Sequence, residues 1–217
     1  MKIKRLHDWN LSLEDARSIQ NELSSMVIKE NSFDRIKTVA GMDIGFHGKV
    51  ARASCVVLTY PECKVIEKRI YEGSVNFPYI PGYLSFREIP ILASVLEMIE
   101  NEPDLLIADG QGVAHPRRLG LAAHIGLLTD KPTIGCAKSL LVGKCEEPEN
   151  RKGAYSYLVD KGEIIGACLR TRVGVKPVYV SIGHRISLES SIEYVLGCCN
   201  KYRLPEPTRE AHRLASG

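Results

Sequence analysis

Long hydrophobic runs are absent from this sequence of 217 residues. No uninterrupted apolar stretch approaches the roughly 18–20 residues that a membrane-spanning helix needs. The basic N-terminus, MKIKRLHDWN, has no apolar segment behind it, so a secretory signal is not expected. We therefore expect a cytoplasmic protein that has no membrane partner.

Closely spaced cysteine pairs are also absent. None of the seven cysteines stands in C-x-x-C spacing with another, which disfavours a structural zinc site. Their number is odd and no export signal is recognised, so we expect reduced thiols, most of them small residues of the core.

Several motifs of common enzyme classes are missing. The segment Gly110-Gln-Gly112 begins like a dinucleotide-binding turn, but residue 115 is a histidine. The segment GCAKS at 135–139 ends like a phosphate-binding loop, but its spacing from glycine to lysine is wrong. No internal repeat and no Gly/Ser linker divides the chain, so we expect one domain over residues 1–217.

The overall composition is that of an ordinary globular chain. Hydrophobic residues make up 44% and charged residues 25%, which argues against disorder. Lys and Arg number 29 against 26 Asp and Glu, a net charge of +3. This balance excludes a histone-like protein but permits a local basic cleft for nucleic acid.

Hydrophobic periodicity predicts an alternation of helices and strands. Ser12 and Asp15 have nearly the spacing and chemistry of a capping box at the start of the first helix. In chain order, we expect a helix over 11–30, strands over 39–46, 53–60 and 65–71, a helix over 86–100, a strand over 104–109, a helix over 117–128, a strand over 133–136, three strands within 155–181, and helices over 187–197 and 206–215. This order favours an α/β fold, a mixed central β-sheet flanked by helices on both faces.

Three acids fall where acids are costly or lie close to a ligand crevice. Asp43 lies inside an apolar strand pattern, Asp109 ends a buried strand, and Glu88 stands in the first turn of the predicted helix. Carboxylates from three elements that met at one point would suit Mg²⁺, which binds through a few carboxylates together with substrate phosphates. Such a site suits phosphodiester hydrolysis. Taken singly, each has a structural alternative. Asp43 could be a bridged strand acid, Glu88 a partner for the helix dipole, and Asp109 a turn residue.

Six motifs in this order resemble endonuclease V over residues 6–214. They are VAGMD at 39–43, FPYIPG at 77–82, FRE at 86–88, DGQGVAHPR at 109–117, GCAKS at 135–139 and PEPTREAH at 205–212. The resemblance implies an RNase H-like fold and a Mg²⁺-dependent endonuclease, with Mn²⁺ also supporting activity. It implies cleavage at the second phosphodiester bond 3′ to inosine, leaving a 3′-hydroxyl and a 5′-phosphate, in the repair of deaminated adenine.

The resemblance also assigns catalytic roles to residues. It makes Asp43, Glu88 and Asp109 the metal-binding acids, places Lys138 beside the scissile phosphate, and places His212 close to the active site. On the sequence alone, Lys138 would be a solvated lysine at a helix start and His212 a surface residue. A lysine beside the phosphate would stabilise charge or position the attacking water.

Nucleic-acid contacts follow from the same resemblance. Two prolines stiffen the segment FPYIPG, so its aromatic residue loses little entropy when it inserts where a flipped base was stacked. Without the resemblance, this segment would be an ordinary Pro-braced loop and the arginines a solvated basic face. The implied strand-separating wedge is Pro78, Tyr79, Ile80 and Pro81; the base pocket is Gly82, Leu84, Gly110, Gly120 and Leu121; the phosphate contacts are Arg87, His115 and Arg117.

Two alternatives to this function remain open on the sequence. One is another RNase H-like nuclease that shares the acidic set but lacks the wedge, and the other is a protein that binds inosine without cutting. The partner is inosine-containing DNA or RNA, because a contact with the 2′-hydroxyl cannot be read from sequence. We expect a monomer, since a lesion in one strand needs no two-fold symmetry.

Overall fold

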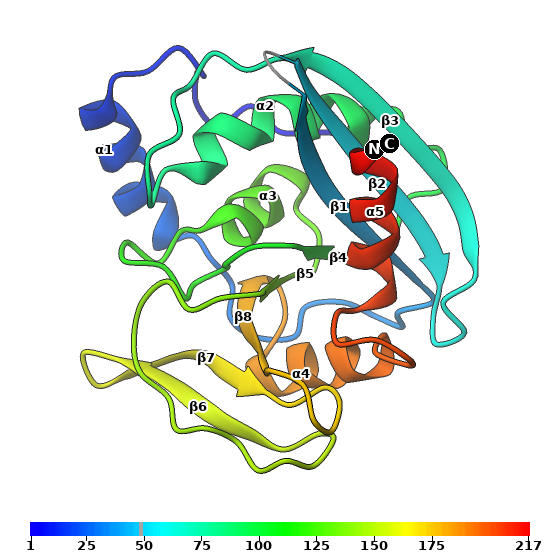
Figure 1. Ribbon diagram of the computed structural model, residues 1–217. Helices are drawn as coiled ribbons and strands as arrows, with labels where there is room; N and C mark the ends of the chain where they lie inside the picture. Colours follow the sequence, from blue (N-terminus) through cyan, green and yellow to red (C-terminus); the bar gives the residue numbers. More distant parts are fainter. Residues whose placement is uncertain (48–49) are drawn as a thin grey trace.

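A mixed β-sheet forms the centre of the protein (Figure 1). The computed structural model describes residues 1–47 and 50–217. Within them, the sheet has the strand order β3-β2-β1-β4-β5-β8-β7-β6. The strands are β1 (Thr38–His47), β2 (Val50–Thr59), β3 (Val65–Ser74), β4 (Leu105–Ala108), β5 (Thr133–Ala137), β6 (Tyr155–Asp160), β7 (Glu163–Leu169) and β8 (Val178–His184).

Antiparallel and parallel pairs meet at β1. On one side, β1 pairs with β2 and β2 with β3 as an antiparallel meander, which confirms the expected hairpin. On the other side, β1, β4 and β5 run parallel, and β8, β7 and β6 complete the sheet in antiparallel pairs. The parallel centre matters for function, because ligands of α/β sheets bind at the carboxyl ends of parallel strands.

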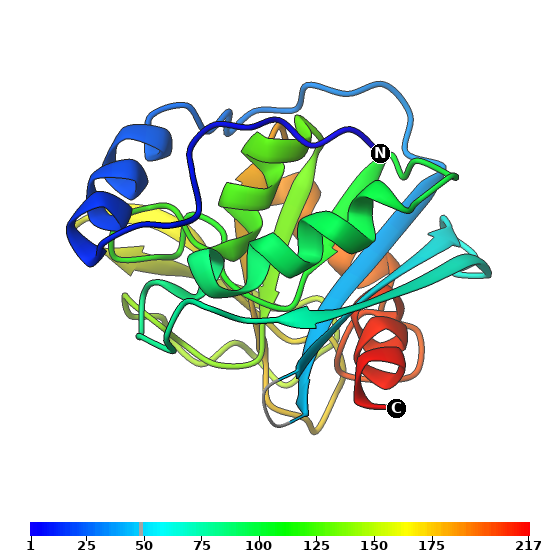
Figure 2. The ribbon, with the colours of Figure 1, turned by 90° about the horizontal axis from the view of Figure 1, so that it is seen from above.

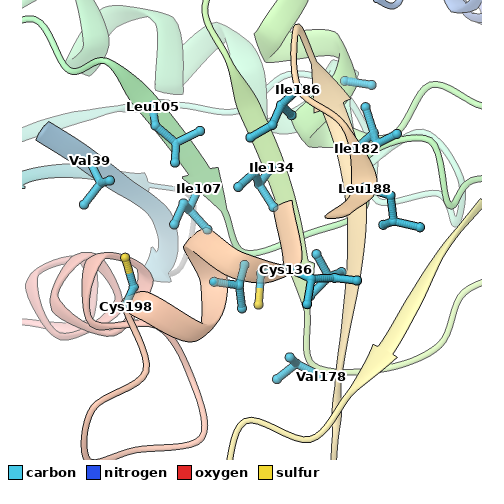
Figure 3. Close-up of a cluster of buried hydrophobic side chains, with 14 of the residues drawn as sticks. Val39, Leu105, Ile107, Ile134, Cys136, Val178, Ile182, Ile186, Leu188 and Cys198 are labelled. Carbon is cyan, nitrogen blue, oxygen red and sulfur yellow. The ribbon is translucent and has the colours of Figure 1, made fainter. Parts of the chain in front are cut away.

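Helices cover both faces of the sheet, as Figure 2 shows from above. The helices are α1 (Leu13–Ser24), α2 (Leu84–Glu97), α3 (Leu121–Thr129), α4 (Leu188–Gly197) and α5 (Glu206–Ser216). In β4, Leu105 and Ile107 pack in a cluster that includes residues of α4 and α5, whereas Leu106 and Ala108 pack with α2 and α3. Figure 3 shows Leu105 and Ile107 in the first cluster. The predicted α/β class, with a mixed sheet and helices on both faces, is confirmed.

The first helix is shorter than predicted. Its capping box is present, since Ser12 and Asp15 bond each other reciprocally, but α1 ends at Ser24 and not at residue 30. The backbone of Ile28 is bonded elsewhere: its N–H donates to Nδ1 of His184 (3.2 Å), and its carbonyl accepts from the N–H of Arg185 (2.7 Å). These tertiary bonds to the end of β8 replace the continued helix that the apolar periodicity predicted.

Two other helix starts differ from the prediction, and both shifts move candidate residues. Because α2 begins at Leu84, Glu88 lies in the second turn and not in the first, so it is not a first-turn partner of the helix dipole. Because α3 begins at Leu121 and not at 117, Arg117 lies in the preceding turn, where Arg118 has a left-handed φ of 57°. A left-handed residue interrupts a right-handed helix, which explains the later start.

The remaining predicted elements are confirmed with shifts of a few residues. Residues 77–82 form neither helix nor strand, as their prolines predict. Five of the seven cysteines are buried, which confirms that most are core residues. Among the described residues, none of the helices has the length and apolar character that crossing a membrane requires.

Candidate active site

Asp43 and Asp109 lie side by side because of the register between two parallel strands. Met42 of β1 pairs with Ala108 of β4, so the aspartate that follows each of them occupies the same level of the sheet. Neighbouring strands are about 4.8 Å apart, and residues in equivalent positions of parallel strands point to the same face. Two carboxylates that are 66 residues apart in sequence are thereby placed at one edge.

Glu88 joins this pair from α2. Burial, together with the negative charges of Asp43 and Asp109, raises the pKa of Glu88 to about 8. Burial also raises the pKa of Asp43, with Asp109 adding to the shift and His212 opposing it. The three acids therefore share one electrostatic environment. We call Asp43, Glu88 and Asp109 together the acidic edge.

Two basic residues reach the acidic edge from other elements. Lys138 directly follows β5 and forms an ion pair with Asp109, so it is not the helix-start lysine of the structural alternative. His212 stands on α5, and its Nδ1 lies 2.7 Å from Oδ2 of Asp43. Although the His212 side chain is 55% exposed, this contact distinguishes it from a freely solvated surface residue.

Gly41 allows α5 to approach the strand that carries Asp43. A Cβ atom at this position would lie 2.1 Å from the carbonyl carbon and oxygen of Pro207, inside the first turn of α5. Only a glycine permits this contact between backbones. The sequence reasoning listed Gly41 within a motif but gave it no role; a glycine inside a strand pattern was the available signal.

The loop at 77–82 is held by its last residue. Gly82 has a φ of +80°, which favours glycine, and its carbonyl oxygen accepts three hydrogen bonds. The donors are Nε2 of Gln20 (3.0 Å), Nε2 of His115 (3.0 Å) and Nη2 of Arg117 (2.7 Å). Tyr79 itself is 70% exposed. The loop is therefore anchored at Gly82, and it exposes the aromatic ring of Tyr79.

The three predicted phosphate contacts make internal bonds in this structure. His115 is buried; its Nε2 bonds the Gly82 carbonyl and its Nδ1 accepts from the backbone N–H of Arg117 (3.2 Å). Burial, with the charge of Arg117, lowers the pKa of His115 to about 4, so the ring is neutral near pH 7. Arg87 donates to the carbonyl of Phe77 (2.7 Å). All three residues thus brace the loop or the turn beside it in this structure, and their contacts with phosphate stay a prediction.

A cavity of about 120 Å³ opens beside this loop. It is lined by four of the five glycines and leucines expected of a base pocket, namely Gly82, Leu84, Gly120 and Leu121. The fifth, Gly110, packs against Leu121. Sequence reasoning did not assign the other lining residues to the pocket; they are Tyr79, Ile80, Pro81, Ser85, Gln111, His115 and Leu141.

The donor chemistry of the acidic edge fits a hard cation. Its three carboxylates supply only oxygen ligands, and burial together with neighbouring negative charge raises the pKa of Asp43 and of Glu88, which a cation would counteract. Within residues 1–47 and 50–217, no three His, Cys, Asp or Glu side chains are already grouped as ligands of one ion. The pairs of Asp43 with His212 and of Asp109 with Lys138 occupy oxygens that a cation would take over.

Comparison with known proteins decides the family. A family model described as Endonuclease V matches residues 21–213. The chain belongs to the endonuclease V family. An Endonuclease V of Nostoc sp. (strain PCC 7120 / SAG 25.82 / UTEX 2576) is 54% identical over 100% of this chain and 99% of its own length.

Solved structures of the family share the fold. The crystal structure of the Endonuclease V from Streptomyces avermitilis is 39% identical and has a TM-score of 0.91, with 99% of this chain and 96% of that chain covered. An Endonuclease V of Ciona intestinalis, in complex with a 24mer DNA containing an inosine followed by a ribo-adenosine, is 31% identical with a TM-score of 0.84, covering 94% and 95%. These likenesses confirm the RNase H-like α/β class that the resemblance implied, and family membership makes the protein a nuclease.

Proposed function

We propose that this protein is a Mg²⁺-dependent endonuclease that binds a flipped-out inosine and hydrolyses the second phosphodiester bond on its 3′ side. One observation carries the proposal: the short segment 82–88 connects the cavity and the acidic edge, with Gly82 and Leu84 at the cavity and Glu88 at the acidic edge. A base held in the cavity therefore places its own strand near the carboxylates.

The acidic edge supplies the hydrolytic part of this function. Asp43, Glu88 and Asp109 would hold Mg²⁺, or Mn²⁺ in its place. When bound, the cation supplies positive charge that orients water and offsets charge on the phosphate. Lys138 carries a second positive charge at the same edge and stabilises the phosphate oxygens as they gain charge.

The bond that breaks determines the products. Water attacks phosphorus, the bond from phosphorus to O3′ breaks, and O3′ takes up a proton. The strand is left with a 3′-hydroxyl and a 5′-phosphate, and the base is not excised. His212 holds the carboxylate of Asp43 through Nδ1 and so positions one of the acids.

The loop at 77–82 and the cavity supply recognition. Tyr79 extends from a loop that is anchored at Gly82, so its ring can enter the stack of nucleic-acid bases without a large loss of conformational freedom. The inosine-containing DNA bound by the Ciona intestinalis relative supports the same substrate class for this chain. The damage repaired would be deaminated adenine in DNA, with RNA as a second substrate to be tested.

A nicking assay with mapped products tests the proposal. Three end-labelled oligonucleotides are incubated with Mg²⁺: DNA with one deoxyinosine, RNA with one inosine, and an unmodified control. We expect a nick one nucleotide beyond the inosine and none in the control, and the faster lesion substrate identifies the preferred nucleic acid. Equal cleavage of the control would leave a general nuclease.

Asp43→Ala separates cutting from binding. Loss of one carboxylate of the acidic edge should reduce nicking at least about 10³-fold while the affinity for the inosine-containing strand is retained. Nicking that survived this substitution would remove the metal assignment. Binding without any nicking by the unaltered protein would favour the non-cutting alternative.

A further inference from the structure

Two buried polar atoms that have no hydrogen-bond partner among the described residues belong to side chains that line the cavity beside the loop. They are Oγ of Ser85 and the amide oxygen Oε1 of Gln111. Ser85 is 2% exposed and Gln111 is 8% exposed, and both line the cavity. An unpaired buried polar group costs about 1–3 kcal/mol, so two of them on one cavity indicate a ligand that supplies their partners.

The orientation of the Gln111 amide is fixed by its other end. Its Nε2 donates to the backbone carbonyl of Ser139 (3.0 Å). Because a carbonyl only accepts hydrogen bonds, the NH₂ group must face Ser139 and the amide oxygen must face away. The backbone carbonyl of Gln111 is also fixed, since it accepts from the N–H of Ala122 in α3 (2.9 Å). The unpaired group of the Gln111 side chain is therefore an acceptor, Oε1.

Ser85 offers the complementary group. Its hydroxyl can donate, and the residue stands in the first turn of α2. The cavity thus combines one rigid acceptor with one hydroxyl donor. The six-position edge of hypoxanthine presents O6, an acceptor, and N1–H, a donor; adenine presents an amino group and a bare N1 acceptor there.

We propose that Gln111 and Ser85 read this edge of the flipped base: Oε1 of Gln111 accepts the hydrogen bond from N1–H, and the hydroxyl of Ser85 donates to O6. This inference rests on the proposed function and adds side-chain readout to the pocket glycines. Adenine is rejected because its N1 lone pair would face the Gln111 oxygen, leaving two buried acceptors unpaired.

The test is a comparison of two lesions with two variants. One DNA oligonucleotide carries deoxyinosine, and the other carries an unsubstituted purine, which lacks O6 and has a bare N1. Single-turnover nicking rates give the ratio of inosine to purine cleavage. In Gln111→Met, which keeps the side-chain volume and removes the acceptor, we expect this ratio to fall about 10-fold, because purine has no N1–H bond to lose.

Ser85→Ala provides an independent measurement. It removes a hydroxyl that has no hydrogen-bond partner within residues 1–47 and 50–217, so we expect no loss of thermal stability and a several-fold fall in the same ratio. The matched control is Ser191→Ala on α4, where a fully buried hydroxyl donates to the Ser187 carbonyl (2.7 Å). That control should lower Tm by about 2–4 °C and leave the ratio unchanged.

The outcomes separate the two proposals. Wild-type protein that does not nick inosine-containing DNA overturns the proposed function and the readout with it. Wild-type protein that nicks inosine, with an unchanged ratio in both variants, overturns the readout alone. If Gln111→Met does not fold, because its bond to Ser139 is also lost, Ser85→Ala decides.

Discussion

The acidic edge and the bracing of Gly82 lie at the two ends of one short segment, yet they are built in opposite ways. At the acidic edge, burial and like charges raise the pKa of Glu88 to about 8, so the protein disfavours the charged form of this carboxyl group. At Gly82, three donors converge on a single carbonyl oxygen. In our proposal an ion completes the first region, whereas the bracing at Gly82 is already formed in the protein alone.

This difference indicates a division of tasks. A wedge that enters a base stack must be rigid, because flexibility would be lost on binding at a cost in affinity. A reaction centre must retain uncompensated charge, because that charge is what holds the cation. Changes at the acidic edge should therefore affect chemistry more than stability, and changes around Gly82 should affect both.

Gly41→Ala is expected to have the largest effect on stability, and it would also disturb the acidic edge by displacing α5. The new Cβ would overlap the backbone of Pro207 and push α5 away, separating His212 from Asp43. Overpacking of this kind costs about 1–3 kcal/mol of the free energy of unfolding. Denaturant unfolding and nicking rates measure the two effects.

Gly73→Ala in β3 is the matched control for this change. The nearest atom to a Cβ there is Cδ1 of Ile91 (2.9 Å), the flexible end of a side chain that can move. We expect a smaller loss of stability and unchanged nicking. Equal effects of the two substitutions would show that the approach of α5 to β1 is not what Gly41 provides.

Arg117→Met would loosen the bracing while leaving the acidic edge intact. It removes the shortest of the three bonds to the Gly82 carbonyl and the bond to Oε1 of Gln20 (2.5 Å). We expect nicking of inosine-containing DNA to fall about 10-fold, with a matching loss of binding. Arg69→Met is the control, because Arg69 pairs with Glu67 and Glu100 and not with the residues that brace Gly82. Identical losses in both variants would contradict a specific role for the Gly82 carbonyl.

Glu88→Gln is expected to have the smallest effect of the three substitutions. It tests the acidic edge through the pH dependence of stability. The pKa of Glu88 is about 8 in the folded protein against an ordinary value of 4.5, so the folded state holds a proton that the unfolded state releases. Without divalent cation, the stability of the wild type should therefore fall as pH rises from about 4.5 to about 8. The glutamine variant should lack this part of the fall, and thermal unfolding in a chelator across that range measures it. If the variant shows the same dependence of thermal stability on pH as the wild type, the Glu88 carboxyl group is not part of the acidic edge.

The sequence was sufficient for the elements that carry Asp43 and Asp109. Both stand in short apolar runs with strong strand patterns, and parallel pairing then puts them at one level of the sheet. The end of α1 was not predictable, because it depends on bonds between Ile28 and the end of β8, more than 150 residues away. Local periodicity contains no information about such partners.

The candidate site divides in the same way. The acids, Lys138 and His212 were identified by motif, and the structure brings them to one edge. His115 was expected at a phosphate, but its burial and its bond to Gly82 depend on a loop more than 30 residues earlier. Ser85 and Gln111 stood inside the recognised motifs as unremarkable polar residues. Only the folded structure shows that both residues line the cavity and that each has a polar atom without a partner among the described residues.

The contact between His212 and Asp43 has a consequence for the biosynthesis of the protein. The two residues are 169 positions apart, and α5 docks on strands that are made early in translation. Residue 212 is added to the chain after all the described strands of the sheet have been made. The full set of reactive groups is thus assembled only at the end of synthesis, and an incomplete chain carries the three acids without the histidine that positions one of them.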